Sequence, residues 1–232
     1  MQNTELILET VVSDMFAENA YLAQLSGRDD CLVVDPGFDV HRIVERLSER
    51  KLTPAAILNT HGHADHIAGN GGLKQIWPNC PLIIGAKDAD KLTDASLNLS
   101  QDYGLPITSP PADHVVKDGE TYVAAGFELE VLEAPGHSPG HIVFLWKSSP
   151  YVVFGGDVLF QGSIGRTDFA DGNFEALKTA IQTRLFRLPG DTIVLPGHGD
   201  PTTVEAEKQH NPFVGAPAGY RDETPSEKPP NS

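Results

Sequence analysis

The sequence predicts a mixed α and β domain in which helices cover layers of β-sheet. Short apolar runs rich in Val, Leu and Ile recur along the chain and are typical of buried strands. Two segments, near residues 40–50 and 173–185, place apolar residues at helical spacing, which indicates helices with one buried face. The segment 114–134 places turn residues between apolar runs and predicts a pair of strands.

In the first half of the chain, four apolar runs predict strands: 5–12, 20–34, 55–60 and 80–86. A helix over 40–50 is expected after Asp39, whose side chain can cap it. A second helix is expected over 67–77, with Pro78 closing it. Residues 87–112 show little periodicity and contain several Pro, Ser and Asp, so they predict mostly loop with some helix.

In the second half, the strand pair of 114–134 is followed by three apolar runs that predict strands: 141–147, 151–157 and 191–199. Asn173 is expected to cap a helix whose apolar stripe consists of Phe174, Leu177, Ile181 and Leu185. The last residues are polar and rich in Pro, which is typical of disorder. The chain therefore predicts one domain over residues 1–214 and a disordered tail over 215–232.

Composition and charge exclude several classes of function. The chain has 232 residues, with 32 Asp and Glu against 17 Lys and Arg, which gives a net charge of −15. Nucleic-acid binding needs a basic face, so no nucleic-acid partner is expected. The sequence has no long apolar run and no signal peptide, which predicts a cytoplasmic protein without a membrane partner. Cys31 and Cys80 form no CxxC pair and are expected to be buried thiols.

The stretch "NTHGHADHIAG", residues 59–69, concentrates side chains that bind metals. His61, His63, Asp65 and His66 follow closely on one another, directly after an apolar run. The whole chain has only 9 His among 232 residues, so such a cluster is rare by chance. His and Asp are the usual protein ligands of zinc, iron and manganese. The cluster therefore predicts a metal site.

Three further strands end in residues of the same type. "LEVLEAPG" leads into His137, "YVVFGG" into Asp157 and "TIVLPG" into His198. In layered α/β folds, functional sites form where strand ends and their loops meet. The strand ends are therefore expected to deliver seven ligands to one rim of the fold.

Seven ligands exceed what one metal needs. A catalytic zinc takes about three protein ligands and keeps one position for water. Two metals about 3.5–4 Å apart can share a carboxylate and a hydroxide, which gives Asp157 a bridging role. The segment from His61 to His66 can serve both metals only as a loop, because its side chains must point to two sides. Gly62 favours that loop.

The other histidines lack such a context. His41 lies on an expected helix, and His114 and His210 have no partner pattern. His141 comes four residues after His137 and is expected to support the ligands rather than to bind a metal.

Five motifs together resemble the metallo-β-lactamase superfamily: "VVDPG", "THGHADH", "APGHSPGH", "GGDVLF" and "LPGHG", in the order in which the family carries them. The match covers nearly the whole chain, up to Phe213. The resemblance implies the α+β fold of that family, an αβ/βα four-layer sandwich. In this fold two β-sheets lie face to face between helices, and the metals lie at one edge.

The resemblance assigns the seven side chains to two divalent metals. The ligands of the first metal would be His61, His63 and His137, and those of the second would be Asp65, His66 and His198. Asp157 would bridge the two metals. Zinc is favoured, and iron and manganese also accept these ligands. Asp35 of "VVDPG" resembles an aspartate that the family places near its metals, although a turn-forming Asp-Pro-Gly explains it equally well.

Two longer segments are similar to glyoxalase II, and more narrowly to its short bacterial form: "LFQGSIGRTDFADGNFEALKTAI" and "LPGDTIVLPGHGDPTTVEAEKQHNPF". The resemblance implies a thioesterase that cleaves S-2-hydroxyacylglutathione, such as S-D-lactoylglutathione, with a hydroxide held between two metals. Asp65 would be the catalytic residue, since its carboxylate can accept a hydrogen bond from the hydroxide and orient it. The expected partner is a small-molecule thioester or glutathione conjugate.

Two departures from full-length glyoxalase II bear on glutathione binding. The full-length enzyme has a C-terminal helical region with basic groups for glutathione, and this chain ends before such a region. It also has "FQGSIGR" where the full-length enzyme places further contacts to its thiol. Both departures argue against tight glutathione binding. Arg166 in this segment could steer an anionic substrate or lock the loop through an ion pair.

A second family shares the fold and keeps an alternative open. "THGHADHIAGNGGLK" resembles the persulfide dioxygenases, which bind one iron through residues matching His61, His137 and Asp157. Those enzymes carry Cys where this chain has His141, and Pro-Ala-His-Asp where it has "PGHGDP". These differences favour the hydrolase. A lactonase would use the same hydroxide, whereas the net charge of −15 disfavours a ribonuclease.

Overall fold

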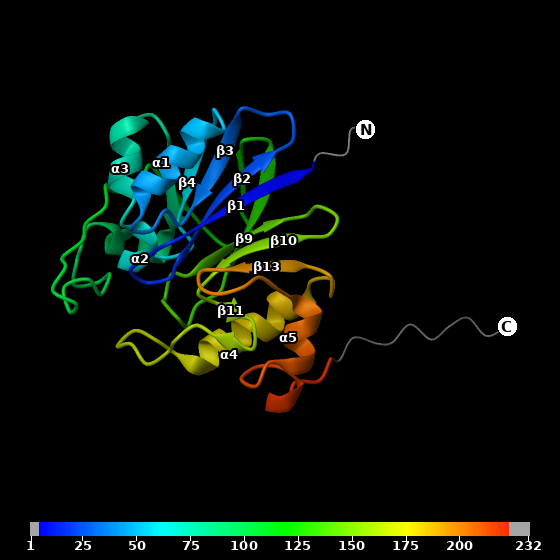
Figure 1. Cartoon of the computed structure of the whole chain (residues 1–232). Coiled ribbons are helices and arrows are strands. Elements are labelled where there is room, and N and C mark those ends of the chain that lie inside the picture. The colour runs from blue at the N-terminus through cyan, green and yellow to red at the C-terminus, as the bar shows by residue number, and fades with distance from the viewer. Residues whose placement is uncertain (1–4, 223–232) are drawn as a thin grey trace.

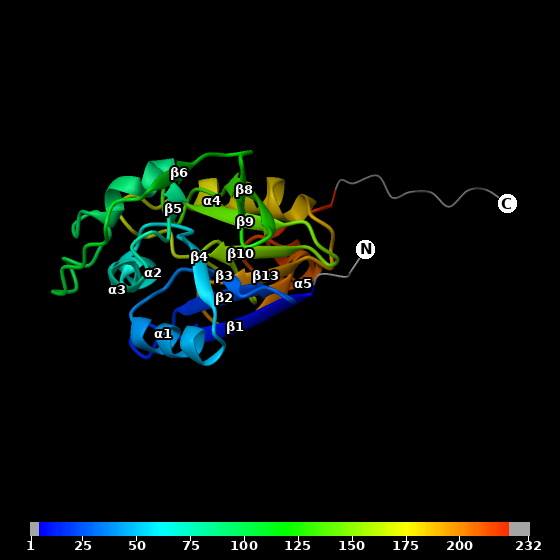
Figure 2. The ribbon, with the colours of Figure 1, turned by 90° about the horizontal axis from the view of Figure 1, so that it is seen from above.

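Two six-stranded β-sheets lie face to face between two layers of helices (Figure 1). The computed structural model describes residues 5–222 of the chain. Helix α1 (Val40–Glu49) lies on the outer side of the first sheet and α4 (Phe174–Thr183) on the outer side of the second, as the view from above also shows (Figure 2). This is the αβ/βα four-layer sandwich of the α+β class expected from the sequence.

The first sheet has the strand order β1-β2-β3-β4-β5-β6. Its strands are β1 (Leu6–Val12), β2 (Asn19–Leu25), β3 (Asp30–Val34), β4 (Thr53–Leu58), β5 (Leu82–Gly85) and β6 (His114–Val116). The first three pair antiparallel, and β3 to β6 pair parallel. The connections between the parallel strands carry α1, the helices that follow β4, and the 3-10 helix η1 (Ala86–Leu92).

The second sheet has the strand order β14-β13-β10-β9-β8-β7. Its strands are β7 (Thr121–Ala124), β8 (Phe127–Glu133), β9 (Ile142–Trp146), β10 (Val152–Gly156), β13 (Ile193–Pro196) and β14 (Thr202–Thr203). β8 and β10 both pair antiparallel with β9, and β13 runs parallel to β10. β8, β10 and β13 therefore end at the same edge of the sheet.

The core lies between the two sheets, and alternate residues of each strand face it. In β2, Tyr21 and Ala23 pack with Phe144 and Phe154 of the second sheet, whereas Leu22 faces the outer helices. Both faces of the central strands are therefore buried, which explains why their sequences are continuous apolar runs rather than alternating ones.

Helices close the two outer faces through their apolar stripes. Ile43 and Leu47 of α1 and Leu73 of α3 (Asn70–Ile76) pack against the first sheet. Leu177 and Ile181 of α4 pack against the second sheet together with α5 (Val204–His210). The stripe of α1 follows the predicted helical spacing, whereas in α4 the predicted Phe174 is exposed and Leu185 lies beyond the end of the helix.

One of the two predicted helix caps is confirmed and the other is wrong. Oδ1 of Asn173 accepts a hydrogen bond of 3.0 Å from the backbone N–H of Ala176, so Asn173 caps α4. Asp39 precedes α1, but its side chain makes no capping bond there. Its Oδ2 instead accepts from the N–H of Asp14, 2.7 Å away, and ties the first loop to the helix.

Several element boundaries differ from the expectation. The helix expected over 67–77 is two helices, α2 (Ala64–Ile67) and α3, separated by Gly69. The segment 114–134 forms three strands instead of two, and 87–112 begins with η1. A small hairpin of β11 (Leu159–Phe160) and β12 (Ser163–Ile164), the 3-10 helix η2 (Leu185–Arg187) and helix α5 were not predicted.

The domain extends beyond the predicted end at residue 214. The 3-10 helix η3 (Ala216–Ala218) follows, and the ring of Tyr220 packs edge-on against Phe186 at 4.9 Å. This contact orders part of a segment whose composition predicted disorder. Residues 223–232 of the expected tail lie outside the described residues.

Both cysteines are buried free thiols, as expected. They lie in the core between the first sheet and its helices. Burial raises the pKa of Cys31 to about 12 and that of Cys80 to about 11, so both stay protonated at neutral pH. Among residues 5–222, no helix combines the length and the hydropathy needed to cross a membrane.

Candidate metal centre

The seven residues predicted as ligands lie together at one edge of the sandwich. Those beyond the first cluster each follow the end of a strand: His137 follows β8, Asp157 follows β10 and His198 follows β13. Three overlapping groups contain all seven, with ligand atoms within 4.8 Å of one another in each: His61, His63 and His137; His61, His66 and Asp157; and Asp65, His66 and His198. We call the first the three-histidine group and the last the Asp65 group.

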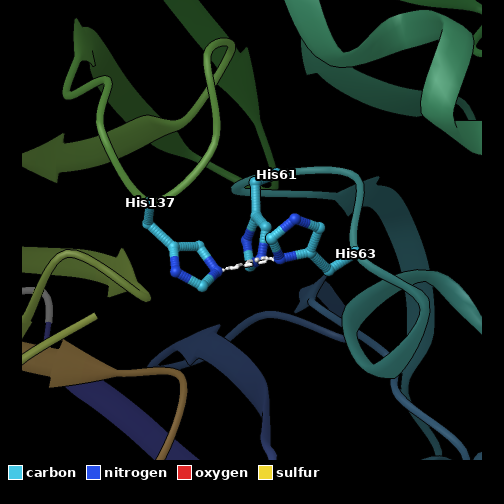
Figure 3. Close-up of side chains that lie close together, drawn as sticks. All are labelled: His61, His63 and His137. Carbon is cyan, nitrogen blue, oxygen red and sulfur yellow. Dashed lines mark hydrogen bonds between the residues drawn. The ribbon is translucent and has the colours of Figure 1, made fainter. Parts of the chain in front are cut away.

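The three-histidine group points its ring nitrogens at one spot (Figure 3). Nε2 of His61 lies 3.0 Å from Nδ1 of His63 and 3.2 Å from Nε2 of His137. The remaining pair, Nδ1 of His63 and Nε2 of His137, is 2.8 Å apart. Three corners of a tetrahedron around zinc, with Zn–N bonds of about 2.0–2.1 Å, lie about 3.3 Å apart. The triangle is therefore close to the size of a three-histidine zinc site.

The outer ring nitrogens show which inner ones carry lone pairs. Nδ1 of His137 lies 2.9 Å from the carbonyl oxygen of Arg166 and therefore donates to it. Nδ1 of His61 lies 3.2 Å from Oγ1 of Thr60, whose own hydrogen goes to Asp35, so this nitrogen also donates. The Nε2 atoms of His61 and His137 are then left with lone pairs that face the centre of the group.

Burial keeps these imidazoles neutral. It lowers the pKa of His61 and of His63 well below the ordinary histidine value, and neighbouring histidines lower both further. Burial also lowers the pKa of His137, although the charge of Asp157 offsets part of that effect. A neutral imidazole binds a cation through its lone pair, so this group is ready for a metal at neutral pH.

The Asp65 group lies beside the three-histidine group. Oδ2 of Asp65 lies 3.3 Å from Nε2 of His198 and 3.8 Å from Nε2 of His66. Asp65 and His66 belong to the single turn of α2, so the expectation that the whole segment from His61 to His66 is a loop is wrong at its end. His63 precedes α2 in extended backbone, and this change of conformation turns the later side chains to the second side.

Three carboxylates control the charge of His66. Burial alone would lower its pKa, but Asp65, Asp157 and Asp35 outweigh that effect and raise the pKa well above the ordinary value. Similarly, burial acts to lower the pKa of His198, but Asp65 and Asp157 raise it. Unlike the three-histidine group, the Asp65 group therefore holds protons that a metal would displace.

Asp157 touches both groups. Its Oδ1 lies 3.4 Å from Nε2 of His66, and its Oδ2 lies 3.5 Å from Nε2 of His137 and 3.6 Å from Nε2 of His198. Burial would raise the pKa of this carboxyl, but His66 and the other two histidines lower it well below its usual range. Asp157 therefore remains a carboxylate whose Oδ2 lies between the two groups while Oδ1 faces His66, a position from which it can bridge two metals.

Asp35 supports the Asp65 group from behind. Its Oδ1 accepts from the N–H of Thr60 at 2.8 Å, and its Oδ2 accepts from the hydroxyl of Thr60 at 2.7 Å and lies 3.1 Å from Nδ1 of His66. Its backbone has a φ of 48°, in the left-handed region. These contacts show that Asp35 orients His66, which agrees with the role near the metals that the resemblance implied.

His141 supports a ligand through its ring. Its Nε2 accepts a hydrogen bond of 3.0 Å from the backbone N–H of Asp157. Its ring stacks on that of His61, with centroids 4.6 Å apart. These contacts agree with the expectation that His141 supports the ligands.

The residues fit a pair of divalent cations. Within residues 5–222, Nε2 of His66 and Oδ1 of Asp157 are buried without a hydrogen-bond partner. Leaving buried polar atoms unpaired is costly, and a cation between them would satisfy both. The donors are imidazole nitrogens and carboxylate oxygens, which suit zinc, iron and manganese.

A cavity of about 250 Å³ opens onto both groups. Four aromatic side chains line it: Phe16, Tyr103, Phe160 and Phe169. The ring of Phe169 lies 5.3 Å from that of His63 and 5.7 Å from that of His137, so it forms a wall beside the three-histidine group. The sequence did not indicate these walls, because Tyr103 and Phe169 lie in segments without periodicity.

Arg166 is the cationic side chain of the cavity lining. Its guanidinium pairs with both carboxylate oxygens of Asp168 at 2.9 Å and lies 4.6 Å above the ring of Phe169. The ion pair that would lock the loop is therefore present. The same loop holds the carbonyl that accepts from His137, so its conformation bears on that ligand.

Comparison with known proteins agrees with a metal centre at this edge of the fold. The model of the metallo-β-lactamase superfamily matches residues 14–198. The probable metallo-hydrolase YqgX of Bacillus subtilis is 44% identical over 198 residues, which are 84% of this chain and 92% of that protein. The hydroxyacylglutathione hydrolase GloC of Haemophilus influenzae is 37% identical over 217 residues, which cover 90% of this chain and 98% of that protein.

Solved structures share the fold along most of the chain. The B3 metallo-β-lactamase BLEG-1 superposes with a TM-score of 0.85 at 36% identity and covers 90% of this chain and 99% of its own. TTHA1623 in a di-iron-bound form has a TM-score of 0.78 at 33% identity, covering 89% and 100%. ETHE1 from Myxococcus xanthus has a TM-score of 0.75 at 28% identity, covering 90% and 85%. With a family model that matches most of its length and relatives this similar, the chain belongs to the metallo-β-lactamase superfamily and is a metallo-hydrolase by family.

Proposed function

We propose that this protein is a metal-dependent thioester hydrolase that acts on S-2-hydroxyacylglutathione, of which S-D-lactoylglutathione is the test case. The observation that carries the proposal is the position of Asp157, whose carboxylate lies within 3.6 Å of ring nitrogens of both the three-histidine group and the Asp65 group. The relative GloC, which is named a hydroxyacylglutathione hydrolase, supports the choice of substrate. We propose a cytoplasmic location, in line with the sequence.

In this proposal, the three-histidine group holds one divalent cation, the Asp65 group holds another, and Asp157 is shared. Zinc is the proposed metal, and the di-iron form of TTHA1623 supports iron as the second choice, with manganese also suited to the ligands. When bound, such a pair supplies a hydroxide at neutral pH and polarises a carbonyl oxygen.

The protein's own groups would orient the reactants. Asp65 lines the cavity, and His66 and His198 keep its carboxyl ionised against the effect of burial. Its carboxylate can therefore accept a hydrogen bond from the attacking oxygen and direct that oxygen at the carbonyl, which makes Asp65 the proposed catalytic residue. Water adds across the C–S bond, so the products are the carboxylic acid and the free thiol.

The cavity favours binding through apolar contact. Its aromatic walls can pack against the acyl group, whereas its one cation, Arg166, is already paired with Asp168. Exposed ion pairs contribute little because water screens them, so Arg166 gives a carboxylate of glutathione little additional attraction. We therefore expect a high KM for S-D-lactoylglutathione.

The experiment is to load the purified protein with zinc, and separately with ferrous iron, and to follow the loss of the thioester absorbance of S-D-lactoylglutathione. Replacing His137 with Ala removes one corner of the three-histidine group and should abolish hydrolysis. Hydrolysis that persists in this variant, or no hydrolysis by the fully loaded wild-type protein, would contradict the proposal.

An iron-dependent persulfide dioxygenase is the alternative. His61, His137 and Asp157 could hold one iron, since Oδ2 of Asp157 lies 3.5 Å from Nε2 of His137. The likeness to ETHE1 fits this alternative. Oxygen uptake by the iron-loaded protein with glutathione persulfide, in the absence of thioester hydrolysis, would favour it.

A further inference from the structure

Helix η1 contacts two of the loops that carry the proposed metal ligands. It begins directly after β5 and lies against the loop with His61 and His63 on one side and the loop with His137 on the other. Its residue Asp88 is fully buried at this junction, with no exposed surface. A buried carboxylate requires hydrogen-bond partners, and both loops supply them.

Asp88 accepts three hydrogen bonds from the two loops. Its Oδ2 accepts from the backbone N–H of Gly62 at 2.9 Å, and Gly62 lies between two of the ligands in sequence. Its Oδ1 accepts from the backbone N–H of Gly140 at 2.8 Å, and its Oδ2 also accepts from the hydroxyl of Ser138. One side chain therefore joins the two chain segments that form the three-histidine group.

The backbones of these loops also touch η1 directly. A Cβ atom at Gly62 would lie 2.5 Å from Cβ of Lys91, and one at Gly140 would lie 2.3 Å from the backbone nitrogen of Asp88. Neither distance is compatible with a side chain larger than hydrogen. The two glycines thus bring the loops close enough for their N–H groups to reach the carboxylate.

We propose that Asp88 is a positioning residue for the three-histidine group. By fixing Gly62 and Gly140 on one carboxylate, it sets the spacing of the loops and so of the ring nitrogens of His61, His63 and His137. The inference rests on the proposed metal binding, but it does not depend on which substrate the protein hydrolyses.

The chemistry of this junction requires a carboxylate. If Asp88 were Asn, its amide oxygen could take the place of either Oδ1 or Oδ2, but not of both. In one orientation the amide NH2 faces the N–H of Gly140, and in the other it faces the N–H of Gly62. One of the two backbone N–H groups therefore loses its bond whichever way the amide turns, although the size of the side chain is unchanged.

The test compares Asp88→Asn with a matched control, Glu207→Gln. Glu207 lies on α5, is also buried, and its carboxylate also accepts three bonds, from Gly162, Thr202 and Asn211. Its partners lie in the turn between β11 and β12, in β14 and at the end of α5, outside the segments that carry the three-histidine group. Both variants lose a buried carboxylate of the same kind, but only one of them loses it at the ligand loops.

Zinc affinity is measured for each binding step by competition with a chromophoric chelator, and Tm is measured with and without zinc. We expect Asp88→Asn to weaken one binding step by about 10–100-fold and to reduce the rise in Tm that zinc causes. Glu207→Gln should lower Tm and leave both affinities unchanged. Zinc affinities in Asp88→Asn equal to those of the wild type, with only a lower Tm, would overturn the proposal.

A milder variant keeps the test decisive if Asp88→Asn does not fold. Ser138→Ala removes one of the three donors and leaves both backbone bonds, so the same binding step should weaken by a smaller factor. Unchanged zinc affinity in Ser138→Ala together with an unfolded Asp88→Asn would count against a positioning role. Because these readouts use zinc alone, failure of the thioester assay would leave them interpretable.

Discussion

Replacing Asp157 with Asn is expected to lower the rate of thioester hydrolysis by about 10³-fold or more. The carboxylate lies 3.4 Å from Nε2 of His66 and 3.5 Å from Nε2 of His137, so it can serve both groups at once. An amide keeps the size of the side chain but loses the negative charge and one oxygen donor. Both proposed metals then lose the negatively charged ligand that they share.

The measurement for Asp157→Asn is kcat with S-D-lactoylglutathione at full zinc loading, together with the zinc content of the protein. Asp191→Asn is the matched control, because Asp191 is exposed and lies just before the start of β13, at the end of that strand opposite to the candidate metal site. The control should behave as the wild type does. An Asp157→Asn protein that binds two zinc ions and keeps a tenth of the wild-type rate would contradict a bridging role.

Replacing His66 with Ala is expected to remove one metal and the hydrolytic activity with it. His66 is fully buried and lies among three carboxylates, those of Asp35, Asp65 and Asp157. Its loss leaves the second metal without its central ligand. The iron of a persulfide dioxygenase would not need His66, so this variant separates the two proposed activities.

The same variant should also destabilise the fold when metal is removed. The pKa of His66 is raised in the folded protein, so its charge stabilises the fold at pH values below the ordinary pKa of about 6.5. That stabilisation is lost as the pH rises through the raised pKa. Removing one partner of a buried charge pair costs about 3–5 kcal/mol, so the loss of stability should be largest in weakly acidic solution.

Metal content, hydrolysis and urea unfolding of metal-stripped protein measure the effects of His66→Ala. His41→Ala is the control, because the side chain of His41 lies on α1, is 75% exposed and belongs to neither ligand group. We expect one zinc ion per chain in His66→Ala and two in the control. Two tightly bound ions, or a hydrolysis rate like that of the wild type, would show that His66 is not a ligand.

The candidate ligands lie where the sequence placed them, because the segments that carry them follow apolar runs. "AAILNT", "YVVFGG" and "TIVLPG" are apolar runs of strand length, and they form most of β4, β10 and β13. The strands β8, β10 and β13 end at one edge, so His137, Asp157 and His198 meet there. Asn173 was predicted correctly because its capping bond goes to Ala176, only three residues further along the chain.

The remaining features depend on tertiary contacts. Asp39 looks like a cap, but the N–H of Asp14 competes for its carboxylate from a distant part of the chain. A ring contact with Phe186 orders Tyr220. The polar residues near Tyr220 in the sequence did not indicate this contact. Asp88 lies in a segment without periodicity, and its proposed positioning role rests only on its hydrogen bonds to two loops. The local sequence pattern contains no information about contact partners that lie far away in the sequence.

The most direct test of the two-metal account is to add zinc stepwise to metal-stripped protein while the hydrolysis of S-D-lactoylglutathione is recorded. The account predicts that the rate rises to its full value only as the second equivalent of zinc binds, because Asp157 must serve both groups. A full rate after one equivalent, or no hydrolysis after two have bound, would contradict it.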